Sequence, residues 1–132
     1  MLMPAISRYM TREPYSIPST TSLARAREVM TSHEIRHLPI LDGAKLVGVV
    51  RSESLAAVEA IPGVDLEHVD VARVMTQPVC VWGSAPLDEV SAVMADTKAD
   101  CVVVLGGQGV QGIFTAVDAL RALEQVLRRA TE

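Results

Sequence analysis

Apolar residues recur along this chain in two rhythms, and the same succession of rhythms occurs twice. Spacings of three and four residues predict amphipathic helices over about Leu23 to Ser32 and Leu87 to Thr97. Helix-start signals precede both, as capping hydroxyls over Ser19 to Ser22 and as a first-turn proline in Ser84-Ala85-Pro86. Each half of the chain therefore contributes a helix with one apolar face.

Short apolar runs on both sides of these helices predict β-strands. One strand is expected before each helix, at Tyr15 to Ile17 and at Val79 to Trp82. After the first helix, Leu38 to Leu41 and Leu46 to Val50 flank Asp42-Gly43, a dipeptide that accepts the positive φ angles of a tight hairpin. The second half repeats the hairpin over Cys101 to Leu105 and Val110 to Thr115, and closing helices are expected to begin near Ser52 and Ala116.

The two halves align with each other at a shift of 64 residues. Identical pairs at this shift are Pro14 and Pro78, Leu23 and Leu87, Val29 and Val93, Met30 and Met94, Leu41 and Leu105, Gly43 and Gly107, and Gly48 and Gly112. Slightly upstream, Met10-Thr11 matches Met75-Thr76 at a shift of 65. We infer two copies of one β-α-β-β-α unit, at residues 1–61 and 71–132, which are joined by a linker at 62–70.

Composition narrows the fold class. Hydrophobic residues make up 49% of the chain and aromatic residues 3%, so the interior must be aliphatic. A unit of about 60 residues with a one-faced sheet buries too little apolar surface to be stable alone. The expected fold is therefore α/β (α+β), with the two repeats packed sheet to sheet.

Charge and cysteine content exclude some classes of partner. A net charge of -4 provides no cationic field to hold a nucleic acid backbone, and no nucleic acid partner is expected. No apolar run approaches the roughly 20 residues that cross a bilayer, so a soluble cytoplasmic protein with no membrane partner is expected. Cys80 and Cys101 each lie in an apolar run and are interpreted as free thiols.

The segment His33-Glu34-Ile35-Arg36-His37 matches the H-E-x-x-H zinc motif, which needs both histidines on one helix face. Pro39 disfavours helical geometry at Leu38, and the following apolar run is typical of a strand. The second histidine would then lie at or beyond the end of the helix. A helix-to-strand junction is the better interpretation, and no metal site is expected.

A second motif, Gly107 to Gly112, matches the G-x-G-x-x-G dinucleotide fingerprint. That fingerprint requires a helix to open where the motif ends. Gly112 to Thr115 instead aligns with Gly48 to Arg51 as the return strand of a hairpin. A glycine-rich hairpin is therefore expected here.

The segment Gly112-Ile113-Phe114-Thr115-Ala116-Val117-Asp118 joins the last strand to the last helix. Local physics favours a capping role, in which Thr115 caps the helix and Asp118 completes a capping box. The same residue types could also hold a ligand, since a carboxylate accepts two hydrogen bonds from a vicinal diol and a helix N-terminus favours phosphate.

The paired Met-Thr segments, Arg36-His37-Leu38-Pro39-Ile40-Leu41 and the final Gly-Ile-Phe-Thr-Ala-Val-Asp resemble paired CBS domains, the family named after cystathionine β-synthase. The resemblance covers about Ser7 to Leu123. It implies two pseudo-twofold-related repeats with two clefts that often bind AMP, ADP, ATP or S-adenosylmethionine. It also implies a homodimer.

By this resemblance, Asp118 binds the ribose hydroxyls and Thr115 lies near the ribose-phosphate, within a motif that also contains Gly112 and Ile113. The other repeat is expected to complete the cleft around the adenine and to supply positive charge, through Thr11, Pro14, Tyr15, Arg36, His37 and Pro39. Other interpretations stay open: Arg36 as a solvated surface charge, His37 as a packed, hydrogen-bonded residue, and Tyr15 as a half-buried sheet residue.

The equivalent cleft of the first repeat departs from the family pattern. Arg51 and Ser54 stand at the positions of Thr115 and Asp118, so the ribose carboxylate is missing. One competent site per chain is predicted. Arg51 is expected to bind an anion there or to pair with an acidic neighbour.

No nucleophile and base occur together with support from their context, so no reaction is assigned. The sequence predicts a non-catalytic regulatory sensor of adenine nucleotides that needs no resident cofactor and relays its state to an unknown regulated protein. The alternative is a structural or protein-interaction CBS module that binds no nucleotide.

Overall fold

The computed structural model describes residues 2–131, so Met1 and Glu132, at the outer ends of the two predicted repeats, lie outside the described residues. The fold is mixed α/β, with four α-helices and two β-sheets in the described part of the chain. The chain divides into two compact units. Unit 2 is the continuous stretch Tyr15–Pro78, and unit 1 joins the residues up to Pro14 to those from Val79 onward.

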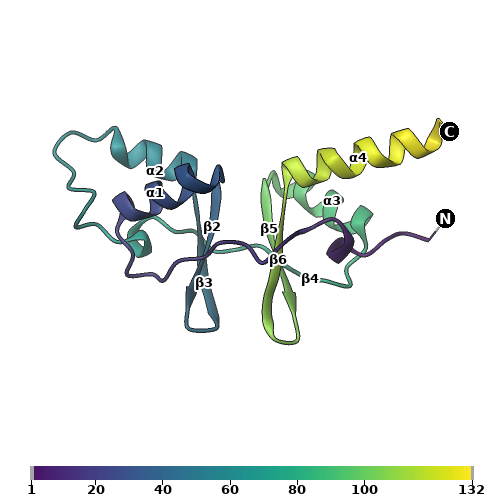
Figure 1. Ribbon diagram of the computed structural model, residues 1–132, viewed down its shortest axis with the longest axis horizontal. Helices are drawn as coiled ribbons and strands as arrows, with labels where there is room; N and C mark the ends of the chain where they lie inside the picture. The colour runs from purple at the N-terminus through teal and green to yellow at the C-terminus, as the bar shows by residue number, and fades with distance from the viewer. Residues whose placement is uncertain (1, 132) are drawn as a thin grey trace. The chain divides into compact units, whose positions relative to one another are not determined.

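Unit 2 contains an antiparallel hairpin with two helices (Figure 1). Its elements are α1 (Leu23–His33), β2 (His37–Asp42), β3 (Lys45–Arg51), α2 (Ser52–Glu59) and the 3-10 turn η2 (Val71–Arg73). A core of aliphatic side chains from all of these elements is buried, including Leu23, Met30, Leu38, Ile40, Val50, Leu55 and Val71. The expected aliphatic interior is therefore confirmed for this unit.

The ends of α1 settle how the H-E-x-x-H segment folds. Ser22 caps the helix, since its side chain accepts a hydrogen bond from the Arg25 N–H at 3.1 Å. The helix ends at His33, because Glu34 adopts a left-handed conformation with a φ of 54°. His37 already belongs to β2. The predicted helix-to-strand junction is confirmed, and the two histidines do not share a helix face.

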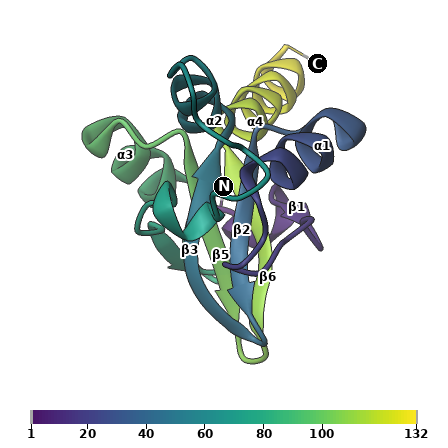
Figure 2. The ribbon, with the colours of Figure 1, turned by 90° about the vertical axis from the view of Figure 1, so that its left-hand side faces the viewer.

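Unit 1 contains a four-stranded sheet in the order β1-β6-β5-β4. Figure 2 labels three of these strands, β1, β5 and β6. Its elements are η1 (Ile6–Arg8), β1 (Thr11–Arg12), β4 (Cys80–Trp82), α3 (Leu87–Thr97), β5 (Cys101–Gly106), β6 (Gly109–Thr115) and α4 (Ala116–Ala130). Strands β5 and β6 form an antiparallel hairpin, which confirms the interpretation of the glycine-rich motif as a turn. The core of this unit contains Ile6, Met10, Val90, Met94, Val102, Val104 and Phe114.

The strand predicted at Tyr15 to Ile17 is wrong. Ile17 makes only an isolated bridge to Ile40, and Tyr15 is exposed. Pro14 and Pro18 on either side lack the N–H groups that a continuous ladder needs. The short strand forms earlier instead, where Thr11 and Arg12 pair with Ile113 and Gly112 of β6.

Each unit includes a short segment, called an arm here, from the neighbouring sequence repeat. Thr11 pairs with β6 of the second repeat, and Thr76 forms an antiparallel bridge with Val49 of β3 in the first. The compact units therefore divide the chain at other positions than the sequence repeats, because residues up to Pro14 pack with the second repeat and η2 packs with the first. The segment from Ala5 to Pro14 is called the N-terminal arm below.

Equivalent glycines make room for these arms. A Cβ atom at Gly112 would lie 2.5 Å from the Thr11 carbonyl oxygen and 2.8 Å from the Met10 sulfur. A Cβ atom at Gly48 would lie 2.7 Å from the sulfur of Met75. The glycine recurs at the 64-residue shift because the same close approach recurs in each unit.

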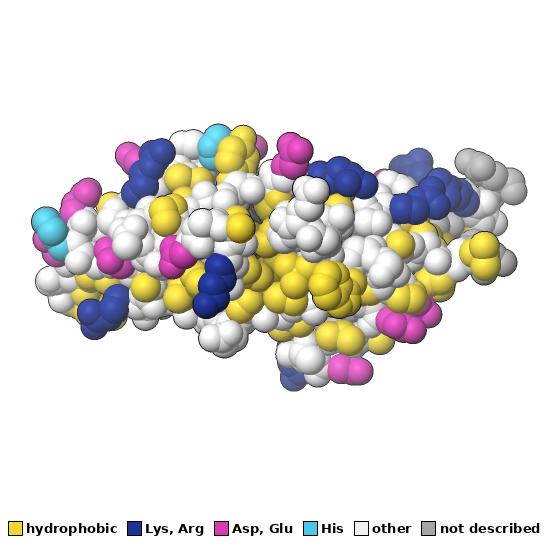
Figure 3. Space-filling view, turned by 90° about the horizontal axis from the view of Figure 1, so that it is seen from below, with side chains coloured by type: hydrophobic (Ala, Val, Ile, Leu, Met, Phe, Trp, Pro, Cys, Tyr) yellow, Lys and Arg dark blue, Asp and Glu magenta, His cyan; other side chains and the backbone are white. Residues whose placement is uncertain are grey.

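The surface retains exposed hydrophobic side chains, as the space-filling view shows for one face (Figure 3). Trp82 of β4 has 63% of its surface exposed, and several apolar residues of α4 are also exposed. Among the helices described, none combines the length and apolar character needed to span a bilayer.

We predict that Gly112→Ala destabilises the fold by roughly 1–3 kcal/mol, because the new methyl group meets backbone of the N-terminal arm that cannot rotate away. Urea unfolding measures the change. Gly107→Ala is the matched control, since a Cβ atom there meets nothing within 4 Å. Equal unfolding midpoints for the two variants would contradict the close approach of the arm.

Candidate functional site

The junction between β6 and α4 positions the two residues that the family resemblance assigns to ribose and phosphate. Thr115 is the N-cap of α4, and its side-chain oxygen accepts a hydrogen bond from the Asp118 N–H at 3.4 Å. Asp118 Oδ2 in turn accepts from the Thr115 N–H at 2.9 Å. The predicted capping box is therefore confirmed, and it holds the carboxylate in a fixed position at the helix N-terminus.

Asp118 is the one buried charged residue of the described chain, with 8% of its surface exposed. The Thr11 hydroxyl from the N-terminal arm donates to Oδ1 at 3.1 Å and to Oδ2 at 3.3 Å. The Thr115 hydroxyl lies 3.2 Å from Oδ2. Hydrogen bonds from the chain therefore stabilise this buried carboxylate.

Strand β6 brings the remaining motif residues to the same place. Ile113 is buried and pairs with Thr11, while Gly112 pairs with Arg12 and lets the arm approach closely. Thr11, Gly112, Ile113, Thr115 and Asp118 thus lie together in unit 1. The contact between Thr11 and Asp118 spans 107 residues of sequence, and its only signal in the sequence is the repeated Met-Thr pair.

Cys101 lies at the start of β5, directly opposite Thr115 in the hairpin register. Burial, followed by the negative charges of Asp100 and Asp118, raises the pKa of the Cys101 thiol to about 12. Cys80 is exposed, although partial burial raises the pKa of its thiol as well. Neither cysteine is in a disulfide, as the sequence predicts.

Most of the residues expected to surround the adenine belong to unit 2. The exposed Tyr15 ring stacks on His33, with ring centroids 3.7 Å apart. Pro39 is buried in β2, His37 begins that strand, and Arg36 is exposed just before it. Pro14, half-buried, ends the N-terminal arm in unit 1.

At the equivalent junction of unit 2 the chemistry differs. Arg51 is the N-cap of α2 and makes no capping hydrogen bond through its side chain. Ser54 occupies the position of Asp118, so a hydroxyl stands in place of the carboxylate. The Thr76 hydroxyl, equivalent to that of Thr11, donates to the Val49 carbonyl oxygen at 3.4 Å.

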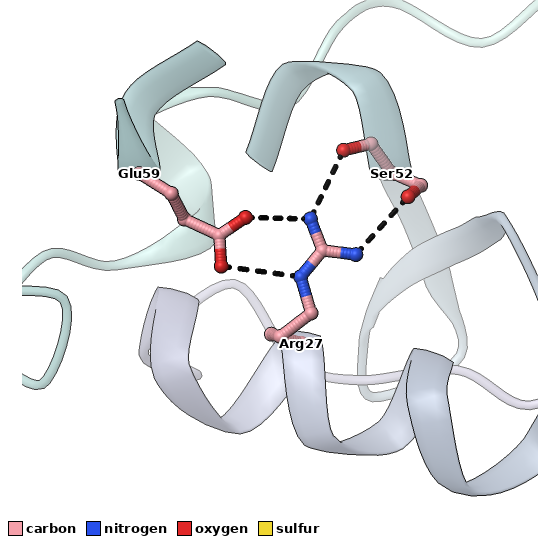
Figure 4. A network of polar contacts seen from close by, with 3 residues as sticks. All are labelled: Arg27, Ser52 and Glu59. Atoms are coloured by element: carbon pink, nitrogen blue, oxygen red, sulfur yellow. Dashed lines mark hydrogen bonds and ion pairs between the residues drawn. The ribbon is translucent and has the colours of Figure 1, made fainter. Parts of the chain in front are cut away.

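Sequence reasoning missed a polar network that joins α1 to α2 (Figure 4). Arg27 donates to both carboxylate oxygens of Glu59, at 2.7 and 3.2 Å, and to the hydroxyl and carbonyl oxygens of Ser52. A shallow cavity of about 300 Å³ beside it is lined by Arg27, Met30, Thr31, Glu34, Ile35, Arg36 and Ser52. The guanidinium makes four hydrogen bonds to α2, so this network serves to hold the two helices together.

The fold and the junction together define a class of protein. It has paired β-α-β-β-α repeats, and one closing helix begins with a Thr-x-x-Asp box whose carboxylate is buried. The CBS domain family model matches residues 6–60 and again residues 71–125. The chain therefore belongs to the CBS domain family and carries two CBS domains.

Solved structures agree with this assignment. A protein assigned to acetoin utilization (AcuB) from Vibrio cholerae is 29% identical, with a TM-score of 0.91 and full coverage of both chains. A CBS domain pair in complex with 5′-methylthioadenosine and S-adenosyl-L-methionine is 25% identical, with a TM-score of 0.83 over 94% of this chain and 98% of that one. A third structure, in complex with AMP, is 25% identical, with a TM-score of 0.80 over 93% and 98%.

Three transferases of different activities also match among curated proteins. One is homoserine O-acetyltransferase from Methanocorpusculum labreanum, which is 39% identical over 71 residues, or 53% of this chain. The chain spans only 13 to 22% of the length of these relatives. Their similarity to this chain is therefore limited to a small part of each protein.

We predict that a disulfide reagent such as DTNB modifies Cys80 well before Cys101 in the folded protein at pH 8. The thiolate is the reacting form, and a pKa of about 12 leaves roughly one Cys101 in ten thousand ionised at that pH. Absorbance of the released thiolate follows the reaction, and peptide mapping assigns it. Equal rates for both cysteines in the native state would contradict the burial of Cys101.

Proposed function

We propose that this CBS pair is a regulatory sensor of an adenosine-containing ligand, namely AMP, ADP, ATP or S-adenosylmethionine, and that Asp118 recognises the ribose. The observation that carries the proposal is a buried carboxylate, fixed at the N-terminus of α4, with hydroxyl groups as partners. A ribose offers the same kind of donor twice, through its vicinal 2′ and 3′ hydroxyls.

The position of Thr115 supports a role beside the phosphate or sulfonium side of the ribose. It begins α4, where backbone N–H groups and the helix dipole favour negative charge. This preference suits AMP, ADP and ATP more than a cationic ligand. The ribose contact at Asp118 is common to all four.

The ligands of two similar structures support adenosine as the common element. One structure contains 5′-methylthioadenosine and S-adenosyl-L-methionine, and another contains AMP. These molecules share an adenine and a ribose diol but differ in phosphate and charge. Recognition through the diol accounts for that range, because it makes no use of the group that varies.

The proposal assigns one competent site to the chain, because Ser54 replaces the carboxylate at the junction of unit 2. In unit 1 the site consists of Gly112, Ile113, Thr115 and Asp118, together with Thr11 from the arm. The further contacts predicted from the sequence, Pro14, Tyr15, Arg36, His37 and Pro39, stay predictions. For Tyr15, stacking on His33 is the contact observed.

A sensor needs only differential affinity. A ligand that binds one arrangement of the molecule better than another shifts the population toward it, and a partner can read that shift. We assign no chemical reaction to the site. The regulated protein is a partner yet to be identified.

A structural module is the second candidate function, and the complete capping box favours it. Thr115 and Asp118 satisfy each other without a ligand, as a helix cap requires. The two candidates differ in one measurable property. A sensor at a ligand concentration 100 times its dissociation constant gains about 2.7 kcal/mol of stability, whereas a purely structural module gains none.

We predict that Asp118→Ala abolishes binding of AMP and S-adenosylmethionine, whereas Ser54→Ala leaves it unchanged. Isothermal titration calorimetry with each ligand measures this. Because Asp118 also caps α4, Asp118→Asn serves as a second variant that keeps the size and one acceptor oxygen of the side chain. Equal affinities for wild type and Asp118→Asn, or equal losses in the Ser54 and Asp118 variants, would refute the assignment.

Self-association as a homodimer, which the family resemblance predicts, has a candidate surface on α4. Only Asp118 and Ala122 of this helix are buried, while Leu120, Leu123 and Leu127 are 65%, 52% and 57% exposed. These leucines follow one another at helical spacing and line an open groove along the helix. An apolar stripe of this kind is stabilised when a second helix covers it.

We predict that Leu123→Glu converts a dimeric chain into monomers, because a charge would be buried against the second copy. Light scattering after size-exclusion chromatography gives the mass. Trp82→Glu is the control, since Trp82 is also exposed but lies on β4. A wild-type chain that runs as a monomer at all concentrations would exclude the homodimer.

A further inference from the structure

The carboxylate of Asp118 already holds several hydrogen bonds from the chain itself. Oδ2 lies within reach of three donors, the Thr115 N–H at 2.9 Å, the Thr115 hydroxyl at 3.2 Å and the Thr11 hydroxyl at 3.3 Å. Oδ1 accepts from the Thr11 hydroxyl at 3.1 Å. An ionised carboxylate offers about four acceptor positions, and a vicinal diol needs two of them. A ribose therefore has to replace a donor that is already present.

The three donors are not equally replaceable. The Thr115 N–H donates one bond of the capping box and the Thr115 hydroxyl accepts the other, so moving Thr115 aside would disturb the first turn of α4. The Thr11 hydroxyl comes from the arm and makes no part of its backbone pairing. Hydrogen bonds of β1 with β6, and burial of Met10 and Ile6, hold the arm whichever way this hydroxyl points.

We infer that Thr11 is an internal competitor of the ribose, and this inference rests on the proposed function. Its hydroxyl occupies the acceptor position that one ribose hydroxyl takes on binding. The ligand exchanges one charge-assisted hydrogen bond for another and adds a second. A sugar with a single hydroxyl gains less binding free energy. It either replaces the Thr11 hydrogen bond without adding a second one, or it binds beside Thr11 and makes one bond. Thr11 is thus a specificity-determining residue that favours vicinal diols and lowers affinity for all of them.

Unit 2 provides the matched comparison. Thr76 occupies the equivalent position in its own arm, but its hydroxyl donates to the Val49 carbonyl oxygen, and Ser54 stands where the carboxylate would be. Thr76 therefore does not compete with a ligand for a carboxylate in unit 2. If removing the hydroxyl acted only on the structure of the arm, the effect should appear at both Thr11 and Thr76.

The test is calorimetry of the full chain with AMP and with 2′-deoxy-AMP, on wild type, Thr11→Val, Thr11→Ser and Thr76→Val. Thr11→Val removes the hydroxyl but keeps the shape, and we expect it to bind AMP about three- to tenfold more tightly, tenfold corresponding to about 1.4 kcal/mol. Its affinity for 2′-deoxy-AMP changes less than twofold. Thr11→Ser restores the wild-type affinities, and Thr76→Val has no effect on either ligand.

Three results would overturn the inference. Weaker AMP binding by Thr11→Val would mean that Thr11 contacts the ligand directly. Equal tightening for both ligands would mean a general loosening of the unit, which urea unfolding of the variants would also detect. If wild type and all variants bind neither AMP nor S-adenosylmethionine, the ribose site fails and the inference with it, an outcome distinct from binding that does not respond to Thr11.

Discussion

The hydrogen bonds around the Asp118 carboxylate connect three parts of unit 1 that lie far apart in the sequence. Thr115 ties it to the end of β6 and the start of α4, and Thr11 ties it to the N-terminal arm. Removing a charge from water is costly unless hydrogen bonds replace those that water made. The arm, the strand and the helix must therefore remain in place for the buried charge to persist, and the local structure depends on that condition.

The two repeats show how one scaffold accommodates different chemistry. In both units a Met-Thr arm packs against the last strand of a hairpin, and a glycine at the same register makes room for a methionine. These shared features are matters of packing. The carboxylate occurs at one junction only, because Ser54 replaces it at the other. The two repeats thus share their packing, whereas the capacity to bind a ribose depends on a single side chain at each junction.

The exchanged arms support the prediction that a single repeat does not fold independently. Each compact unit lacks part of its core unless the neighbouring repeat supplies an arm, as Ile6 and Met10 do for unit 1 and Val71 does for unit 2. The N-terminal arm leads directly into the other unit. Loss of the hydrogen bond between Thr11 and Asp118 would therefore change the end of the arm that adjoins that unit.

Local patterns were sufficient for most elements and for the candidate motif. The spacing of apolar residues, the caps before Leu23 and Leu87 and the Asp42-Gly43 turn predicted helices and hairpins within a few residues, because these features depend on neighbours in the sequence. The capping box at Thr115 and Asp118 was predictable for the same reason. The pairing of Thr11 with β6, the absence of a strand at Tyr15 and the network of Arg27 with Glu59 were not. Those contacts are between residues distant in the chain, and only the packing of whole elements decides which distant groups meet.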